Sequence, residues 1–250
     1  MRKIALICSG VAALALTACT QQADDTEAKA DKADKVVWDY DGEEGPENWG
    51  DLSAEFATCK TGTQQSPIDL PARGEAKTVD VTTNYGSQSA KIVDKGYTVQ
   101  ADFAEGASFT SGDTTFNLLQ MHMHTPSEHT VTGKSYPLVA HFVHQSGEGE
   151  FGVLGILFEE GEANASLQTI LDNVGGETDV DIAAMLPSAL TAYNYPGSLT
   201  TPPCSEGVNW HVVASPATAS AEQIEALNGM MKNNARPVQP LNERTLTAAE

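Results

Sequence analysis

The stretch Gln120-Met-His-Met-His124 decides how this chain is expected to fold, because its residues alternate as a β-strand requires. Successive side chains of a strand point to opposite faces, so one face carries Gln120, His122 and His124. The other face carries the apolar residues Leu119, Met121 and Met123. Two imidazoles on one face can bind one metal ion. A third His from a neighbouring strand would complete a site with one position left open for water.

A second histidine pair lies in the downstream segment Ala140-His-Phe-Val-His144. Together the two segments and His129 hold five of the six histidines of the chain. Strand alternation places His141 with Val143 on one face and His144 on the other, so His144 cannot reach the same ion without a bulge.

The chain of 250 residues is 40% hydrophobic, which suits one sizeable globular domain. Short segments rich in Val, Thr, Tyr and Phe predict strands. They are 91–93, 97–101, 108–110, 115–125, 138–144 and 152–158. Helices are predicted at 166–173 and at 220–232, the second opened by a capping box of Ser220 and Gln223. The expected fold is mostly β, a central twisted and mostly antiparallel sheet with a few surface helices.

The N-terminus has the features of an export signal. Met1-Arg-Lys3 precedes an apolar run that ends in Leu16-Thr-Ala-Cys19, which resembles a bacterial lipoprotein signal. We therefore expect residues 1–18 to be removed and Cys19 to carry the lipid; an ordinary secreted protein is the alternative. Residues 19–37 read as a flexible acidic tether, and 38–250 as the folded domain. The predicted location is the periplasmic side of a bacterial membrane, the outer one.

The chain is strongly acidic, with 14 Lys and Arg against 34 Asp and Glu. Loss of Arg2 and Lys3 with the signal leaves 12 against 34, a net charge of 12 − 34 = −22. Nucleic acid is therefore excluded as an expected partner, and membrane attachment would come only from the lipid on Cys19. A homodimer is left open.

Two of the four cysteines remain for the folded domain, Cys59 and Cys204. In an exported protein such a pair predicts a disulfide, with two buried free thiols as the alternative.

From Trp38 to the C-terminus the chain resembles the α-class carbonic anhydrases. Nine segments carry the resemblance, in order: Trp38-Asp-Tyr40, Gly45-Pro-Glu-Asn-Trp49, Gln65-Ser-Pro-Ile-Asp69, Gln120-Met-His-Met-His124, Ser127-Glu-His129, Ala140-His-Phe-Val-His144, Tyr195-Pro-Gly-Ser-Leu-Thr-Thr-Pro-Pro203, Val208-Asn-Trp210 and Asn234-Ala-Arg-Pro237. The resemblance implies a central twisted sheet with Zn²⁺ at the bottom of a conical cleft, and reversible hydration of CO2 to bicarbonate and a proton by a zinc-bound hydroxide.

Carried over residue by residue, the resemblance makes His122, His124 and His141 the zinc ligands, and makes His129 and His144 structural. Thr200 matches the residue that accepts the hydroxide proton and donates to a buried carboxylate, here Glu128. Thr201 matches a bicarbonate contact, and Gln120 matches the partner of His122. The apolar wall for CO2 would be formed by Val143, Val153, Leu199, Val208 and Trp210. Without the resemblance, these five residues would be interpreted as ordinary core residues. Cys59 and Cys204 match the disulfide of exported members.

Two positions depart from the family pattern. Val139 stands where the family has a Glu that hydrogen-bonds the third zinc His, which predicts weaker or faster-exchanging zinc. Tyr97 stands at the position of the proton-shuttling His of fast members. Because a phenol titrates near 10, proton removal is expected to limit turnover, although Tyr97 could simply line the cleft.

Two other classes compete with this interpretation. His122, His124 and Glu128 also fit the first metal motif of cupins, which bind iron or manganese, but the upstream Gly and the second cupin segment are lacking. The second is a non-catalytic zinc-binding surface protein of the same fold.

Overall fold

The computed structural model describes residues 36–74 and 77–246. The predicted signal, the tether through residue 35 and the lipid site Cys19 lie outside these residues and stay predictions. Within the described residues, no helix has both the length and the apolar character that a membrane span needs.

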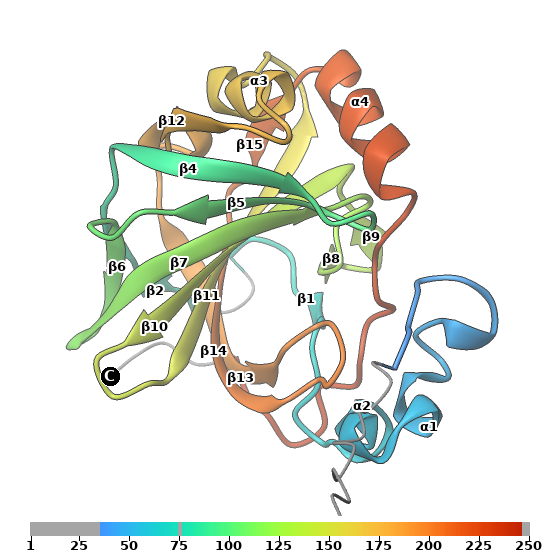
Figure 1. The fold of residues 1–250 in the computed structure, drawn as a ribbon. Helices are drawn as coiled ribbons and strands as arrows, with labels where there is room; N and C mark the ends of the chain where they lie inside the picture. Colours follow the sequence, from blue (N-terminus) through green and yellow to red (C-terminus); the bar gives the residue numbers. More distant parts are fainter. Residues whose placement is uncertain (1–35, 75–76, 247–250) are drawn as a thin grey trace, which may run out of the picture. The chain divides into compact units, whose positions relative to one another are not determined.

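A large mixed sheet forms the body of the domain (Figure 1). In sheet order its strands are β12 (Glu177–Asp181), β4 (Ser87–Asp94), β5 (Val99–Phe103), β7 (Thr114–His124), β10 (Leu138–Ser146), β11 (Phe151–Glu160), β14 (Glu206–Val213), β13 (Thr191–Ser198) and β2 (Val79–Asp80). Three short strands join it at its margins: β3 (Thr82–Asn84), β6 (Ser108–Ser111) and β15 (Ala217–Ala219). Among the described residues of this sheet, only the pairings of β11 with β14 and with β15 are parallel, so the predicted mostly antiparallel sheet is confirmed.

A small second sheet and several helices accompany the main sheet. The small sheet pairs β1 (Asp69–Leu70), β8 (Thr130–Val131) and β9 (Lys134–Ser135). The short helices are η1 (Gly42–Glu44), α1 (Trp49–Leu52), η2 (Ala54–Phe56), α2 (Thr58–Thr61) and η3 (Ala183–Met185).

The two longer helices are α3 (Ala165–Asp172) and α4 (Ala221–Met231), close to the predicted ranges. The predicted capping box is present, because the Ser220 hydroxyl accepts the backbone N–H of Gln223 and the Gln223 side chain accepts that of Ser220. In Figure 1 both helices lie at the end of the sheet occupied by β4, β12 and β15.

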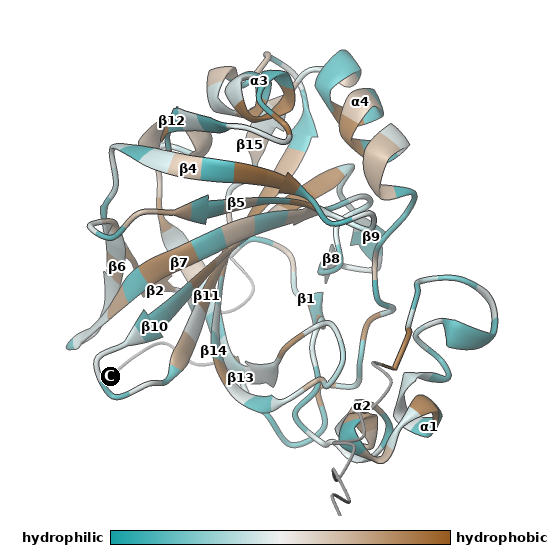
Figure 2. Ribbon diagram, in the orientation of Figure 1, coloured by the Kyte–Doolittle hydropathy of each residue, from teal (hydrophilic) through white to brown (hydrophobic). Residues whose placement is uncertain are grey.

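The central strands β10 and β11 are buried on both faces, and their apolar residues serve two separate cores. Phe142, Leu154 and Ile156 face the larger core, which extends to α3 and α4. Val139, Val143 and Val153 face a smaller core around Trp210. Figure 2 shows the corresponding hydrophobic bands along β4, β7 and the neighbouring strands. The candidate histidines lie on the side of the smaller core.

One expectation about the histidine strand was wrong. Leu119 was predicted to share a face with Met121 and Met123, but its side chain is 42% exposed whereas theirs are fully buried. The reason is a β-bulge: Val143 pairs with Gln120 while the next residue, His144, pairs with Leu118. Leu119 is the extra residue, so the alternation shifts by one there. From Gln120 onward the pattern is regular, and the predicted faces of His122 and His124 are unaffected.

Candidate metal centre

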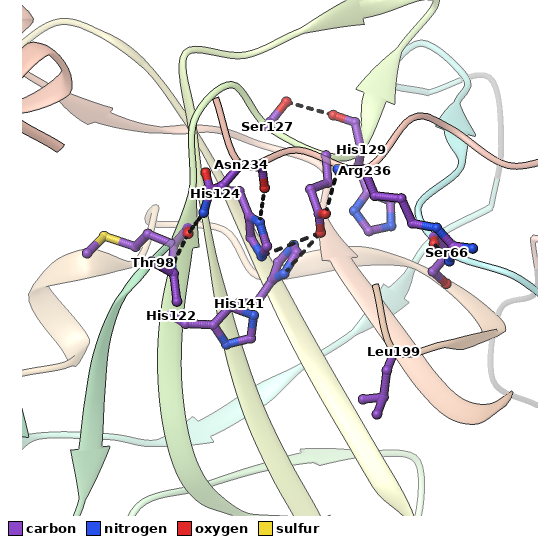
Figure 3. Close-up of polar contacts among 12 residues, drawn as sticks. Ser66, Thr98, His122, His124, Ser127, His129, His141, Leu199, Asn234 and Arg236 are labelled. Carbon is purple, nitrogen blue, oxygen red and sulfur yellow. Dashed lines mark hydrogen bonds and ion pairs between the residues drawn. The ribbon is translucent and has the colours of Figure 1, made fainter. Parts of the chain in front are cut away.

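Three histidines from two adjacent strands converge at one point. In the antiparallel register of β7 and β10, His141 lies directly opposite His122, and His124 follows on the same face of β7. One nitrogen of each ring can be chosen so that the three lie within 4.8 Å of one another. His124 and His141 are each only 1% exposed, whereas His122 is half-buried, so the point is approached from the side of His122. Figure 3 shows the three rings facing a common centre.

Hydrogen bonds determine which nitrogen the two β7 histidines present. His122 Nδ1 lies 2.9 Å from Oε1 of Gln120, the partner that the sequence predicted. His124 Nδ1 lies 2.7 Å from the backbone carbonyl oxygen of Asn234. A carbonyl only accepts, so each Nδ1 carries the hydrogen and each Nε2 keeps its lone pair free.

His141 presents its other nitrogen. Its Nδ1 lies 3.7 Å from Glu128 Oε2, and the same oxygen lies 3.5 Å from the free Nε2 of His124. Nδ1 of His141 is therefore on the side of the centre. Its Nε2 is buried and finds no hydrogen-bond partner among the described residues. Val139, two residues earlier on the same face, offers no acceptor, as the sequence predicted.

Burial holds two of the three histidines, His122 and His141, in the neutral form. Burial, and then the neighbouring His124, lower the pKa of His122 to about 3. Burial lowers the pKa of His141 as well, with His124, His122 and His129 adding to the effect. Neutral imidazoles with free lone pairs are the form that binds a metal ion. Three nitrogen ligands with one open direction fit zinc in its catalytic coordination, so the residues present suit the ion that the sequence predicted.

Glu128 is a buried carboxylate beside the centre, only 2% exposed. Its Oε1 accepts the backbone N–H of Arg236 at 3.0 Å. Burial raises the pKa of Glu128, and this is opposed by the electrostatic interaction with the neighbouring His124 ring, by a hydrogen bond from the Thr200 side chain and by Arg236. The structure thus brings together Thr200 and Glu128, the pair that the sequence analysis had linked.

The loop that carries Thr200 and Thr201 is fixed by the Cys59–Cys204 disulfide, which is present as predicted. The backbone N–H of Cys204 donates to the carbonyl of Thr201 at 2.9 Å. On the other side of the bond, the Arg236 guanidinium donates to the Cys59 carbonyl at 3.0 Å. The disulfide is therefore connected to the threonine loop and, through Arg236, to Glu128.

The five residues predicted as an apolar wall gather on one side of the centre. Val143, Val153, Val208 and Trp210 belong to the smaller core, and Leu199 packs against it. Val143 pairs with Val153, and Val153 in turn pairs with Trp210, across three neighbouring strands. The Trp210 ring lies 4.8 Å from the His141 ring, between centroids.

Tyr97 belongs to a cluster of aromatic rings. Its ring is 4.9 Å from that of Trp38 and 6.4 Å from that of Tyr40, between centroids. The side chain is partly exposed, and burial raises its pKa above the usual value of a phenol.

Two contributors to the centre were missed by sequence reasoning. Asn234 binds both the ring of His124 and, through its side-chain oxygen, the backbone N–H of Thr125. Arg236 donates its backbone N–H to Glu128. Their contacts with His124 and Glu128 use backbone atoms, for which the sequence carries no side-chain signal.

Comparisons with known proteins agree with this geometry. The sequence model of the family described as eukaryotic-type carbonic anhydrase matches residues 44–250. A carbonic anhydrase of Pectobacterium atrosepticum is 38% identical over 243 residues, which cover 94% of this chain and 96% of that protein. Among solved structures, the α-carbonic anhydrase of Photobacterium profundum has a TM-score of 0.76 at 42% identity, covering 85% of this chain and 100% of that one. The enzyme of Thermovibrio ammonificans, solved with the inhibitor sulfanilamide, has a TM-score of 0.76 at 39% identity, with coverages of 84% and 98%.

Proposed function

This chain belongs to the eukaryotic-type carbonic anhydrase family, and on that premise we propose that it uses one Zn²⁺ to hydrate CO2 reversibly to bicarbonate and a proton. The observation that carries the proposal is the convergence of the three imidazoles of His122, His124 and His141 beside the buried Glu128. An imidazole binds a metal ion in its neutral form, so the full charge of a dication would remain available to act on a fourth ligand.

Zinc bound there would act as a Lewis acid that makes water acidic enough to lose a proton near neutral pH. The protein supplies the orientation. Because the Thr200 hydroxyl donates its hydrogen to Glu128, its oxygen is left to accept one from the nucleophile. The backbone N–H of Arg236 holds the carboxylate in place at Oε1. Thr200 thus turns a lone pair of the nucleophile toward the substrate.

The apolar wall suits an uncharged substrate. Val143, Val153, Leu199, Val208 and Trp210 offer CO2 a surface that water binds poorly, next to the open position of the centre. We assign Thr201 to bicarbonate, because it neighbours Thr200 on the disulfide-bound loop. A proton must then leave without help from Tyr97, and Val139 leaves one ligand unsupported. We therefore propose that turnover is slower than in relatives with a shuttle His.

The test is stopped-flow hydration of CO2 by the purified, zinc-loaded protein and by a Thr200→Ala variant. Thr200→Val, which keeps the shape but not the hydroxyl, is the matched control for packing. We expect both variants to lose about 100-fold in rate, in the range typical of one oriented hydrogen bond in a transition state. A wild-type protein that binds one zinc and does not hydrate CO2 would instead indicate the non-catalytic zinc-binding alternative.

For location we propose export and lipid attachment through Cys19, on the periplasmic side of the outer membrane. The signal-like N-terminus supports export, and the Cys59–Cys204 disulfide suits an oxidising compartment. Fractionation of cells that express the wild type and Cys19→Ser tests this: the wild type should sediment with membranes and the variant should be soluble. A wild-type protein found wholly in the soluble fraction would refute the anchor.

A further inference from the structure

Two buried ring nitrogens next to the metal centre lack a hydrogen-bond partner. They are Nδ1 of His129 and Nε2 of His141, and the two rings are 0% and 1% exposed. Their centroids lie 6.0 Å apart, with the ring planes at 83°. Figure 3 shows the two rings beside each other. The Trp210 ring covers both, with its centroid 4.8 Å from each.

The hydrogen on His129 can be placed from its neighbours. Ser66 Oγ accepts the backbone N–H of Ser198 at 3.1 Å, so its own hydrogen goes to the Tyr195 hydroxyl at 3.0 Å. The Tyr195 hydrogen is then free for Nε2 of His129, 2.6 Å away. This order gives every buried hydroxyl hydrogen an acceptor. The hydrogen of neutral His129 therefore lies on Nδ1, where it meets no acceptor.

The hydrogen on His141 follows from the centre. Its Nδ1 faces Glu128 and the free nitrogen of His124, so Nδ1 gives its lone pair to the metal and Nε2 carries the hydrogen. This step rests on the proposed function. Val139 shares the face of His141 and is fully buried, but it cannot accept a hydrogen bond. Two N–H donors from neighbouring, nearly perpendicular rings are thus left without an acceptor among the described residues.

We propose that one small monovalent anion of the halide class binds between His129 and His141, beside Val139, and accepts both hydrogens. An acceptor-only ligand suits the site because a water molecule would bring two hydrogens of its own. The side chains packed around Val139 include Leu157 and Val212, which accept none, and the Trp210 N–H already donates to the Ser198 carbonyl.

The charges next to this position also favour an anion. Glu128 and Arg236 are the formal charges beside the centre, and they cancel each other. A bound dication then leaves two buried positive charges without compensation, which a nearby monoanion reduces to one. The anion would therefore strengthen metal binding as well as satisfy the two donors.

The test uses crystals of the zinc-loaded protein grown in sodium bromide, with anomalous data collected at the bromine and zinc absorption edges. Wild type, Val139→Glu and Val139→Leu are compared. We expect a bromine peak within hydrogen-bond distance of His129 Nδ1 and His141 Nε2 in wild type only, because Glu supplies the acceptor and Leu fills the space. Zinc occupancy from the same crystals tests the proposed function separately.

Chelator competition in solution gives the second measurement. Replacing chloride with gluconate should lower the zinc affinity of wild type by about tenfold, the lower end of what loss of a ligand's hydrogen-bond partner costs. The zinc affinity of Val139→Glu should change much less on the same replacement. Because halide can bind the metal directly in both proteins, this variant is also the control for that effect. Zinc at full occupancy with no bromine peak between the two rings, or equal anion effects in wild type and Val139→Glu, would overturn the proposal.

Discussion

The rings of Tyr97 and Trp38 pack against each other, with centroids 4.9 Å apart and planes at 56°. The contact holds Tyr97 among aromatic neighbours that carry no base. Burial raises the pKa of Tyr97 further above that of a free phenol. A group with so high a pKa is protonated at neutral pH and cannot accept a proton from the metal centre.

Replacement of Tyr97 by His should therefore increase turnover when proton removal is limiting. An imidazole titrates near neutral pH and can relay the proton. We expect Tyr97→His to raise kcat for CO2 hydration several-fold in dilute buffer, with little change in kcat/KM. Tyr97→Phe is the matched control and should leave kcat unchanged.

Added imidazole buffer should raise kcat of the wild type and have less effect on Tyr97→His. If neither the buffer nor the substitution changes kcat, another group already removes the proton.

Val139→Glu should strengthen zinc binding, because its carboxylate can accept the unpartnered N–H of His141. In halide-free buffer we expect an affinity gain of about 10- to 100-fold by competitive chelation. Gln120→Leu, which removes the partner of His122, should produce a loss of similar size. Equal zinc affinity in wild type and Val139→Glu would show that His141 needs no such partner.

Loss of the disulfide should affect both stability and the site. The bond joins residues 145 positions apart and fixes the loop that carries Thr201. We expect Cys59→Ser with Cys204→Ser to lower the free energy of unfolding by about 2–5 kcal/mol in urea titrations. Reductant should destabilise the wild type and leave the double variant unchanged. A double variant as stable as oxidised wild type would contradict this role.

Acid should destabilise the fold through buried histidines outside the centre. Burial lowers the pKa of His144 to about 3 and that of His211 to about 4. In the unfolded chain these histidines bind protons near pH 6.5, whereas in the native state they do not. Their full contribution to the free energy of unfolding is therefore present above pH 6.5 and is lost as pH falls toward 3 to 4.

His211→Phe tests this, since the His211 ring already packs against Phe109 and Phe116. Between pH 6 and 4, the free energy of unfolding of the variant should change less steeply with pH than that of wild type. The difference in slope should correspond to at most about one bound proton. Identical slopes would mean that His211 is protonated in the native state.

Strand alternation predicted the candidate centre well because His122, His124 and His141 lie in regular stretches of β7 and β10. The same rule misplaced Leu119, because a bulge leaves no mark in the local pattern. Strand β13 was not predicted, since it contains Pro196 and Gly197. On the side away from β14, β13 pairs with β2 only at residues 191 and 192. Pro196 therefore has no strand partner on that side, and the N–H that proline lacks costs the sheet no hydrogen bond there.

Other parts of the site depend on contacts between distant segments. The Asn234 carbonyl reaches His124 from 110 residues away in the sequence, and a backbone oxygen has no residue type of its own. The resemblance to a family supplied roles for Thr200 and Glu128 that alternation could not. The unpartnered nitrogen of His129 became evident only when Ser66, Tyr195 and His129 were seen in one chain of hydrogen bonds.

The most direct test of the central claim is a zinc titration of the metal-free protein, followed by CO2 hydration. We expect activity to rise linearly to one equivalent of zinc, to stop rising there, and to be abolished by a sulfonamide. His141→Ala should show neither the activity nor tight binding of zinc. Full binding of one zinc by the wild type without hydration of CO2, or activity that survives complete removal of metal, would contradict the account.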